Sequence, residues 1–272
     1  MDEARLIKII NVNPSIIGTI DNPTDEMKKL ALQKNGLLLK DIKEPTDEMK
    51  HIALENNVRA IKFIEEPNEE MMLKAISKGW SILEYIKNPT DKVIELAIEQ
   101  SGWAIQYIKN PSEELQLEAV RKNYDSIKYI ENPSEKVQLE AVKIKYDALR
   151  YINNPALSAE LLSIKSNEAA IKLIKDLNKD KILEFLKANI LVIKYITKSL
   201  ENEISPDDVK EVLKETLSKE DIEEKYVRDF LNCSIIDRNS DVIVLDKIMF
   251  IYKYGSKKSK QIAVDEKLKF MN

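Results

Sequence analysis

Hydrophobic residues recur along this chain at a fixed interval of 22 residues, as from Ile17 to Leu39, with polar and charged residues between them. A fixed period of this length is typical of repeat arrays, in which each unit buries its apolar face against its neighbours. Two columns have nine members each at this interval, so the pattern predicts nine repeats over residues 1–198. The first column is Ile17, Leu39, Ile61, Leu83, Ile105, Ile127, Leu149, Ile171 and Ile193, and the second is Ile20, Ile42, Ile64, Ile86, Ile108, Ile130, Ile152, Ile174 and Ile196.

Prolines mark the boundaries of the repeats. A proline keeps the residue before it out of the α-helical region and suits the first turn of a helix. In residues 110–123, Asn110 is the expected N-cap, Pro111 the first helical residue and Glu113 the acid of a capping box. Each proline is therefore predicted to end one helix and to begin the next. Seven of the nine prolines keep the interval of the array, at Pro23, Pro45, Pro67, Pro89, Pro111, Pro133 and Pro155.

Each repeat is predicted to contain two helices. Leu115, Ala119 and Val120 recur at helical spacing and mark the buried face of the first helix. We expect this helix to end at an asparagine, and the pair Asn35 and Gly36 indicates a left-handed end. The second helix has room for about two turns and is expected to be partly 3₁₀. The predicted fold is an all-α solenoid of nine 22-residue two-helix repeats.

Residues 199–272 leave the register of the repeats and are predicted to form a C-terminal helical cap or interaction domain. Ser205 and Pro206 are expected to open a helix there. The stretch 240–255 is apolar on nearly every side and ends at Gly255, which predicts a buried helix. A homodimer formed through this C-terminal region is the alternative use of its apolar residues.

Composition argues against several functional classes. The 43 Lys and Arg nearly balance the 47 Asp and Glu, and a net charge of -4 disfavours a generic polyanion binder. With one histidine, His51, and one cysteine, Cys233, we expect no catalytic residues, no metal site and no cofactor, and Cys233 is predicted to be a buried apolar residue. We expect no membrane span and no export signal, and hence a cytoplasmic protein.

The candidate binding residues lie in and beside the second helices. An aromatic column (Phe63, Tyr85, Tyr107, Tyr129, Tyr151, Tyr195) follows a basic column (Lys40, Lys62, Lys128, Arg150, Lys172, Lys194) that Glu84 and Gln106 interrupt. The tyrosine rings either pack between repeats or form an exposed strip. The tryptophans occur in repeats four and five, where Trp103 suits ordinary repeat packing and Trp80 does not, and as a pair they are a candidate apolar anchor for a partner. The predicted partner-binding residues are Trp80, Tyr85, Trp103, Tyr107, Tyr129, Tyr151, Lys128, Arg150, Lys172 and Lys194.

Two functions follow from these columns. The first is a non-enzymatic scaffold that binds a protein along the aromatic column. The alternative is a nucleic-acid or nucleotide-binding protein that uses the basic column. The acidic net charge and the break at Glu84 and Gln106 favour the first.

The segments "NPSEELQLEAVRKNYDSIKYI" (110–130) and "SGWAIQYIKNP" (101–111) resemble a short two-helix repeat family of unknown function. That family occurs in bacterial, phage and giant-virus proteins. The resemblance implies a helical array used for binding, with no catalytic residues. It also implies a host or viral protein as the partner, and a phage-encoded inhibitor of a host defence complex as the role.

Overall fold

The computed structural model describes residues 3–196 and 204–269. Within residues 3–196, α-helices alternate with 3₁₀ helices (η) in nine pairs, one pair for each predicted repeat. The predicted all-α repeat solenoid is therefore confirmed. The chain forms two compact bodies, an N-terminal body (Met1–Asn132) and a C-terminal body (Pro133–Asn272).

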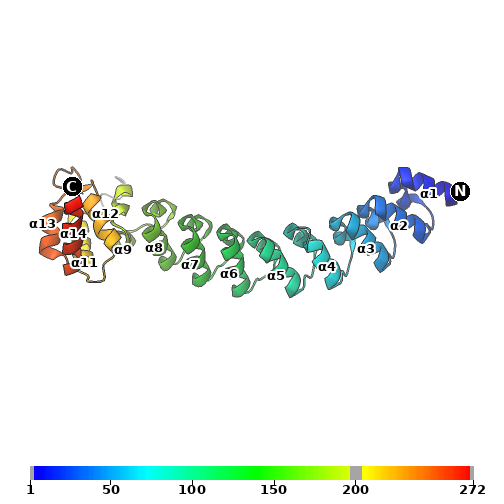
Figure 1. The fold of residues 1–272 in the computed structure, drawn as a ribbon, viewed down its shortest axis with the longest axis horizontal. Coiled ribbons are helices and arrows are strands. Elements are labelled where there is room, and N and C mark those ends of the chain that lie inside the picture. The colour runs from blue at the N-terminus through cyan, green and yellow to red at the C-terminus, as the bar shows by residue number, and fades with distance from the viewer. Residues whose placement is uncertain (1–2, 197–203, 270–272) are drawn as a thin grey trace. The chain divides into compact units, whose positions relative to one another are not determined.

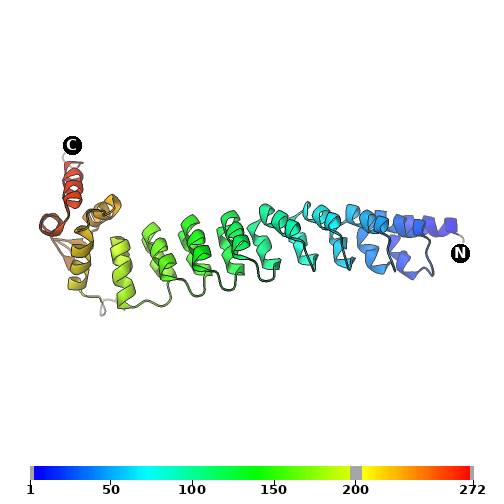
Figure 2. The same cartoon turned by 90° about the horizontal axis from the view of Figure 1, so that it is seen from below.

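The N-terminal body holds the first six repeats, whose α-helices lie side by side (Figures 1 and 2). Its α-helices pack on one another, and its 3₁₀ helices form a second, parallel row of contacts. The elements are α1 (Glu3–Val12), η1 (Pro14–Thr19), α2 (Asp25–Lys34), η2 (Gly36–Asp41), α3 (Asp47–Asn56), η3 (Val58–Phe63), α4 (Glu69–Ile76), η4 (Trp80–Tyr85), α5 (Asp91–Gln100), η5 (Gly102–Tyr107), α6 (Glu113–Lys122) and η6 (Tyr124–Tyr129).

The C-terminal body holds three further repeats and then the C-terminal helices. Its elements are α7 (Glu135–Ile144), η7 (Tyr146–Tyr151), α8 (Leu157–Ser166), η8 (Glu168–Leu173), α9 (Lys179–Ala188), η9 (Ile190–Tyr195), α11 (Pro206–Leu217), α12 (Glu224–Asn232), β1 (Ile236–Asp237), β2 (Ile243–Val244), α13 (Lys247–Tyr254) and α14 (Lys257–Lys269). The predicted domain boundary at residue 198 lies outside the described residues.

The α-helices begin later than the prolines suggest. Ser112 caps α6, because its side chain accepts a hydrogen bond from the backbone N–H of Leu115. The prediction that Asn110 is the N-cap was wrong: Asn110 has a φ of 50° and belongs to the turn before the helix. Pro111 stands just before the capping residue, so it orders the turn but is not the first helical residue. Thr24, Thr46, Asn68 and Ser134 cap their helices in the same way.

The helix ends also differ from the prediction at Asn35. Its φ of −152° is extended and not left-handed, and its side chain accepts the N–H of Leu37 to start η2. Gly36 provides space and not a left-handed helix end, because a Cβ at this residue would lie 2.2 Å from the carbonyl oxygen of Ala53. The glycine therefore allows close approach of η2 to α3. The second helix of each repeat is a six-residue 3₁₀ helix and not only partly one.

The core follows the two hydrophobic columns. Every member of the first column is buried, and in the second column only Ile20, Ile108 and Ile196 are half-buried. Leu115 is half-buried, whereas Leu117 of the same helix is buried. Six alanines are fully buried where successive helices approach closely: Ala31, Ala53, Ala75, Ala97, Ala119 and Ala141.

The C-terminal helices cover the last repeat, because α11 packs on α9 and α12 packs on η9. Ser205 caps α11, as predicted, in a capping box with Asp208. The hydroxyl of Tyr226 in α12 donates to the carbonyl oxygen of Leu186 in α9, at 2.9 Å. This part of the chain is therefore attached to the repeats by both packing and buried polar contacts.

The stretch 240–255 does not form the single buried helix that was predicted. Ile243–Val244 pairs in parallel with Ile236–Asp237, so this part of the predicted all-α fold contains a short pair of strands. The carboxylate of Asp246 accepts the N–H of Met249 and starts α13 only at Lys247. Ile251 is the only buried residue of α13.

Candidate partner-binding surface

The 3₁₀ helices present the predicted binding residues, because their inward residues are fixed in the core. In η5, Ala104 and Ile105 are buried, and this leaves Trp103 and Gln106 exposed on the opposite face. A 3₁₀ helix has three residues per turn, so residues three apart share a face. The side-chain amide of Gln106 accordingly donates to the carbonyl oxygen of Trp103 at 2.9 Å.

Three aromatic side chains from repeats four and five meet on this surface. The ring centroids of Trp80 and Trp103 are 6.4 Å apart in an edge-to-face arrangement. Those of Trp80 and Tyr107 are 6.3 Å apart with an angle of 32° between the ring planes. Trp103 is 37% exposed, and the other two rings are half-buried. We call these three residues the aromatic cluster, which lies wholly within the N-terminal body.

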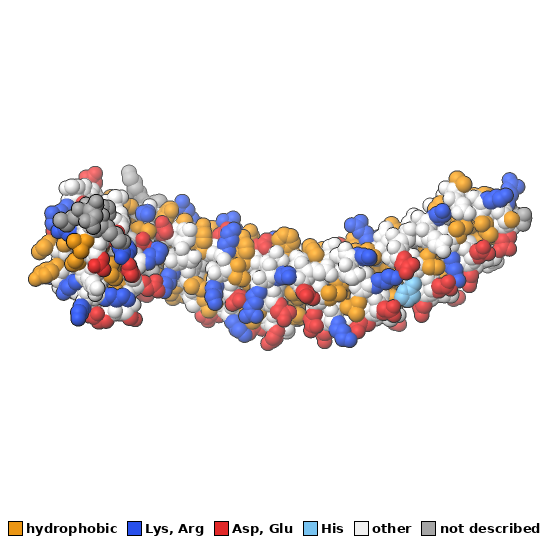
Figure 3. Space-filling view, viewed as in Figure 1, with side chains coloured by type: hydrophobic (Ala, Val, Ile, Leu, Met, Phe, Trp, Pro, Cys, Tyr) orange, Lys and Arg blue, Asp and Glu red, His pale blue; other side chains and the backbone are white. Residues whose placement is uncertain are grey.

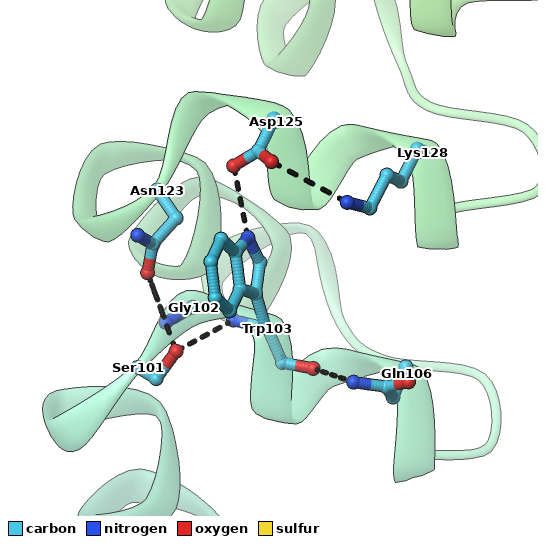
Figure 4. A network of polar contacts seen from close by, with 7 residues as sticks. All are labelled: Ser101, Gly102, Trp103, Gln106, Asn123, Asp125 and Lys128. Atoms are coloured by element: carbon cyan, nitrogen blue, oxygen red, sulfur yellow. Dashed lines mark hydrogen bonds and ion pairs between the residues drawn. The ribbon is translucent and has the colours of Figure 1, made fainter.

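Hydrogen bonds to the next repeat hold the Trp103 indole in place (Figure 4). Its Nε1–H donates to Oδ1 of Asp125 at 2.8 Å, and Oδ2 of Asp125 lies 3.4 Å from Nζ of Lys128. The ammonium of Lys128 lies 5.5 Å from the centre of the indole ring. Burial alone would lower the pKa of Lys128, but the hydrogen bond and charge of Asp125 outweigh it and the pKa is raised. The indole is thus fixed at both its polar and its aromatic parts.

The backbone around Trp103 is held equally closely. A Cβ at Gly102 would lie 2.0 Å from the carbonyl oxygen of Ala119, so η5 approaches the next helix as only a glycine allows. The N–H of Gly102 donates to Oδ1 of Asn123 at 2.8 Å, and the N–H of Trp103 donates to Oγ of Ser101 at 3.3 Å. These hydrogen bonds, drawn in Figure 4, hold the start of η5 against the next repeat and so set where the Trp103 side chain lies.

Trp80 reaches the cluster through an irregular helix end. α4 has 8 residues, whereas α3 and α5 have 10 each, and it ends at Ile76. The chain then turns through Gly79, whose φ is 159°, so that η4 begins with Trp80. Trp80 therefore stands at the position that Gly102 has one repeat later.

The remaining predicted residues of the N-terminal body lie next to the cluster. Tyr129 is 41% exposed, and Nζ of Lys128 lies 4.9 Å from its ring centre. Burial raises the pKa of Tyr107, and the charge of Glu84 and the neighbouring Tyr85 and Tyr129 raise it further. Tyr107 is therefore in a crowded site near an acidic group.

The predicted residues Tyr151, Arg150, Lys172 and Lys194 belong to the C-terminal body. Tyr151 is half-buried, and its ring is thus neither wholly packed between repeats nor wholly exposed. The three cations have acidic or aromatic neighbours. These contacts are Arg150 with Asp147 at 3.8 Å, Lys194 with Glu168 at 3.7 Å, and Lys172 at 4.5 Å from the ring centre of Tyr195.

Residue patterns alone did not indicate Asp125 and Asn123 as part of this surface. A signal for Asp125 exists, since it follows Trp103 by the length of one repeat and so faces it from the next unit. Cys233 is buried, as predicted. No group of three His, Cys, Asp or Glu that could hold a metal ion occurs in residues 3–196 or 204–269. Over the same described residues, every helix is too short or too polar to cross a membrane.

Comparison with known protein families, with curated proteins and with solved structures found no match.

Proposed function

We propose that this chain is a non-enzymatic scaffold that binds a protein partner through the aromatic cluster and the adjoining Tyr85 and Tyr129. The observation that carries the proposal is the exposed indole of Trp103, which is hydrogen-bonded to Asp125 and in contact with Trp80. Tryptophan and tyrosine dominate the energetics of protein interfaces because they bury a large area at a small entropic cost. A ring already fixed by Asp125 loses little further freedom on binding.

The basic column supports nucleic-acid binding less well. Nucleic-acid affinity arises when cations replace the counterions of phosphates. Lys128, Arg150 and Lys194 already have acidic neighbours, whose charges would oppose a phosphate. Lys and Arg are also interspersed with Asp and Glu over the face of the molecule seen in Figure 3, with no continuous basic stripe. The inhibitory role and the phage origin that the resemblance implies stay predictions.

The test begins with capture and identification of a partner from the natural source by mass spectrometry, followed by affinity measurements on the purified pair. Tyr107→Ala and Trp80→Ala should each weaken binding by about 1–2 kcal/mol, or roughly 5- to 30-fold in Kd. Tyr151→Ala, at the equivalent position of a repeat in the other body, is the matched control. Circular dichroism should show that every variant keeps its helical content.

The same measurements at two salt concentrations test the alternative. If the partner is nucleic acid, Lys128→Ala combined with Arg150→Ala should weaken binding most, and affinity should fall steeply with salt. If the partner is a protein bound at the cluster, the salt dependence should be modest. Unchanged affinity in Tyr107→Ala and Trp80→Ala would contradict the proposal.

A further inference from the structure

At two places in the chain, a lysine lies over the aromatic-column ring of the following repeat. Nζ of Lys62 lies 5.8 Å from the ring centre of Tyr85, which belongs to the following repeat. The same sequence spacing relates Lys172 to Tyr195, where the distance is 4.5 Å. In these two pairs a lysine of one repeat lies over the aromatic ring of the next, an arrangement that is stabilised by attraction of the ammonium to the ring face.

Glu84 breaks this arrangement at the aromatic cluster. It precedes Tyr107 by the same spacing as Lys62 precedes Tyr85, so it stands where the array elsewhere has its cation. In the described part of the chain, no lysine or arginine lies over the rings of Tyr107 or Trp80, which contact each other instead. The site thus presents two aromatic rings that lack the cation found elsewhere in the array.

The carboxylate of Glu84 is suited to receive a cation there. Its side chain is exposed and makes no ion pair within residues 3–196 or 204–269. Its charge reaches the Tyr107 hydroxyl, whose pKa is raised first by burial and then by Glu84. Glu84 has the same sequence spacing to Tyr107 as Lys62 has to Tyr85, so a positive group over the Tyr107 ring would face a π surface with a negative charge nearby.

We propose that the partner inserts one arginine side chain over Tyr107 and Trp80, with its guanidinium paired to Glu84. This inference rests on the proposed function and names the partner chemistry at the same site. Arginine fits better than lysine, because its planar and weakly hydrated guanidinium stacks on aromatic rings and pairs with a carboxylate through two parallel hydrogen bonds.

The neighbouring cations limit the partner to a single arginine in an otherwise neutral segment. Lys62 lies over Tyr85 on one side of the site, and Lys128 lies over Trp103 on the other. These ammonium groups repel further positive charge, so a polybasic segment gains nothing over one arginine.

Intrinsic fluorescence offers a direct probe, since the two tryptophans of the chain, Trp80 and Trp103, both lie in the cluster. The probe ligand is a capped tripeptide with arginine between two alanines. Its control has citrulline in place of arginine, which keeps the shape and removes the charge. We expect a saturable change in tryptophan emission with the arginine peptide and none with the citrulline peptide.

Two charge variants test the role of Glu84. Glu84→Lys places the array's own cation over Tyr107 and should weaken the arginine peptide by at least about tenfold, since a good charged contact at such a site is worth that much. Glu131→Lys has the same change in charge at an exposed residue of the same body and should stay within about twofold of the parent. Circular dichroism confirms that both variants are folded.

The outcomes separate the inference from the proposed function. Equal binding of the two peptides, equal binding of the arginine peptide to Glu84→Lys and to the parent, or no saturable change with either peptide would overturn the inference. If binding of the purified partner is weakened by Tyr107→Ala but not by Glu84→Lys, the proposed function holds, and the inference that the partner inserts an arginine is contradicted. If the arginine peptide binds at Glu84 but Tyr107→Ala leaves the affinity for the purified partner unchanged, only the proposed function is contradicted.

Discussion

A methyl group added at Gly102 should destabilise the N-terminal body more than any comparable change on its surface. The Cβ of Gly102→Ala would lie 2.0 Å from the carbonyl oxygen of Ala119 and 2.8 Å from its carbonyl carbon. Real Cβ contacts under 3.0 Å are essentially never found, so η5 and α6 must separate by about 1 Å. Both obstructing atoms belong to the backbone and cannot rotate away.

The magnitude has a lower and an upper bound. Separation lengthens the 2.8 Å hydrogen bond from the Gly102 N–H to Asn123, and losing a buried hydrogen bond costs about 1 kcal/mol. Overpacking by a methyl group in a close-packed interface costs about 1–3 kcal/mol. Relaxation is feasible, because Val58 and Tyr124 stand at the equivalent position of other repeats. We therefore expect a loss of about 2–3 kcal/mol in the free energy of unfolding.

Chemical denaturation followed by circular dichroism and by tryptophan fluorescence measures this loss, and fluorescence reports on the region next to the substitution. Gly18→Ala is the matched control. Its Cβ would meet the flexible side chain of Asp41 at 3.3 Å and no backbone atom within that distance. Because alanine is also the better helix former, Gly18→Ala should change stability by less than about 1 kcal/mol.

Equal unfolding midpoints for Gly102→Ala and Gly18→Ala would refute the reasoning. That result would mean that η5 is not held against α6 as closely as described. A loss confined to fluorescence, with circular dichroism unchanged, would show instead that the repeat opens locally while the rest of the array stays folded.

Three further changes test the core, the cap and the attachment of the C-terminal helices. Ile130→Ala, in the buried second column, should cost about 2–5 kcal/mol in denaturation, whereas a loss below half a kcal/mol would place that column in solvent. Lys179 and the cap contacts of Ser205 lower the pKa of Asp208 from 3.8 to about 2, so the stabilisation is complete above pH 4 and is lost as the pH falls towards 2. Asp208→Asn should remove about 1 kcal/mol at pH 7 and should show a smaller loss of stability between pH 4 and pH 2 than the parent. Tyr226→Phe leaves the Leu186 carbonyl without its partner and should cost about 1–2 kcal/mol, measured as reduced hydrogen-exchange protection of α12.

The architecture of the repeats could be predicted from the sequence because the same hydrophobic spacing recurs in every repeat. Nine copies of one hydrophobic spacing leave only one face to bury, and a proline at a fixed place separates the helices. The details of capping could not be predicted as securely. Asn110 and Ser112 are both good capping residues two positions apart, and the choice depends on the turn that Asn110 makes with a positive φ.

The C-terminal region shows the limit of the same reasoning. The apolar run from Val242 to Tyr254 predicts helix and burial, but periodicity cannot tell a buried helix from a strand followed by an exposed helix. Asp246 caps α13 and so sets the start of the helix at Lys247. A hydrophobic pattern does not register a single capping residue, so this start was not predicted. This segment occurs once in the chain, so, unlike the repeats, it offers no second copy against which the prediction could be checked.

The candidate site was predicted in part. The sequence places Trp80 and Trp103 in adjacent repeats, but their contact depends on the short α4 and on the turn at Gly79, after which Trp80 begins η4 at the position that Gly102 has in η5. Asp125 was missed because its one signal, a spacing of one repeat length from Trp103, does not distinguish it from the other acids of a charged chain. Its role emerges only when the indole of Trp103 is seen to donate to it.

Glu84 is the residue at which effects on stability and effects on binding can be separated most clearly. Its position carries Lys or Arg in six other repeats, and that side chain is exposed each time, so the core makes no demand on it. Glu84→Lys should accordingly leave the free energy of unfolding unchanged or raise it by up to about 1 kcal/mol, through the cation–π contact that Lys62 already makes with Tyr85. The same variant should lose the arginine peptide. Denaturation and peptide titration on one preparation test both outcomes, and a clear loss of stability would show instead that the acid serves the fold.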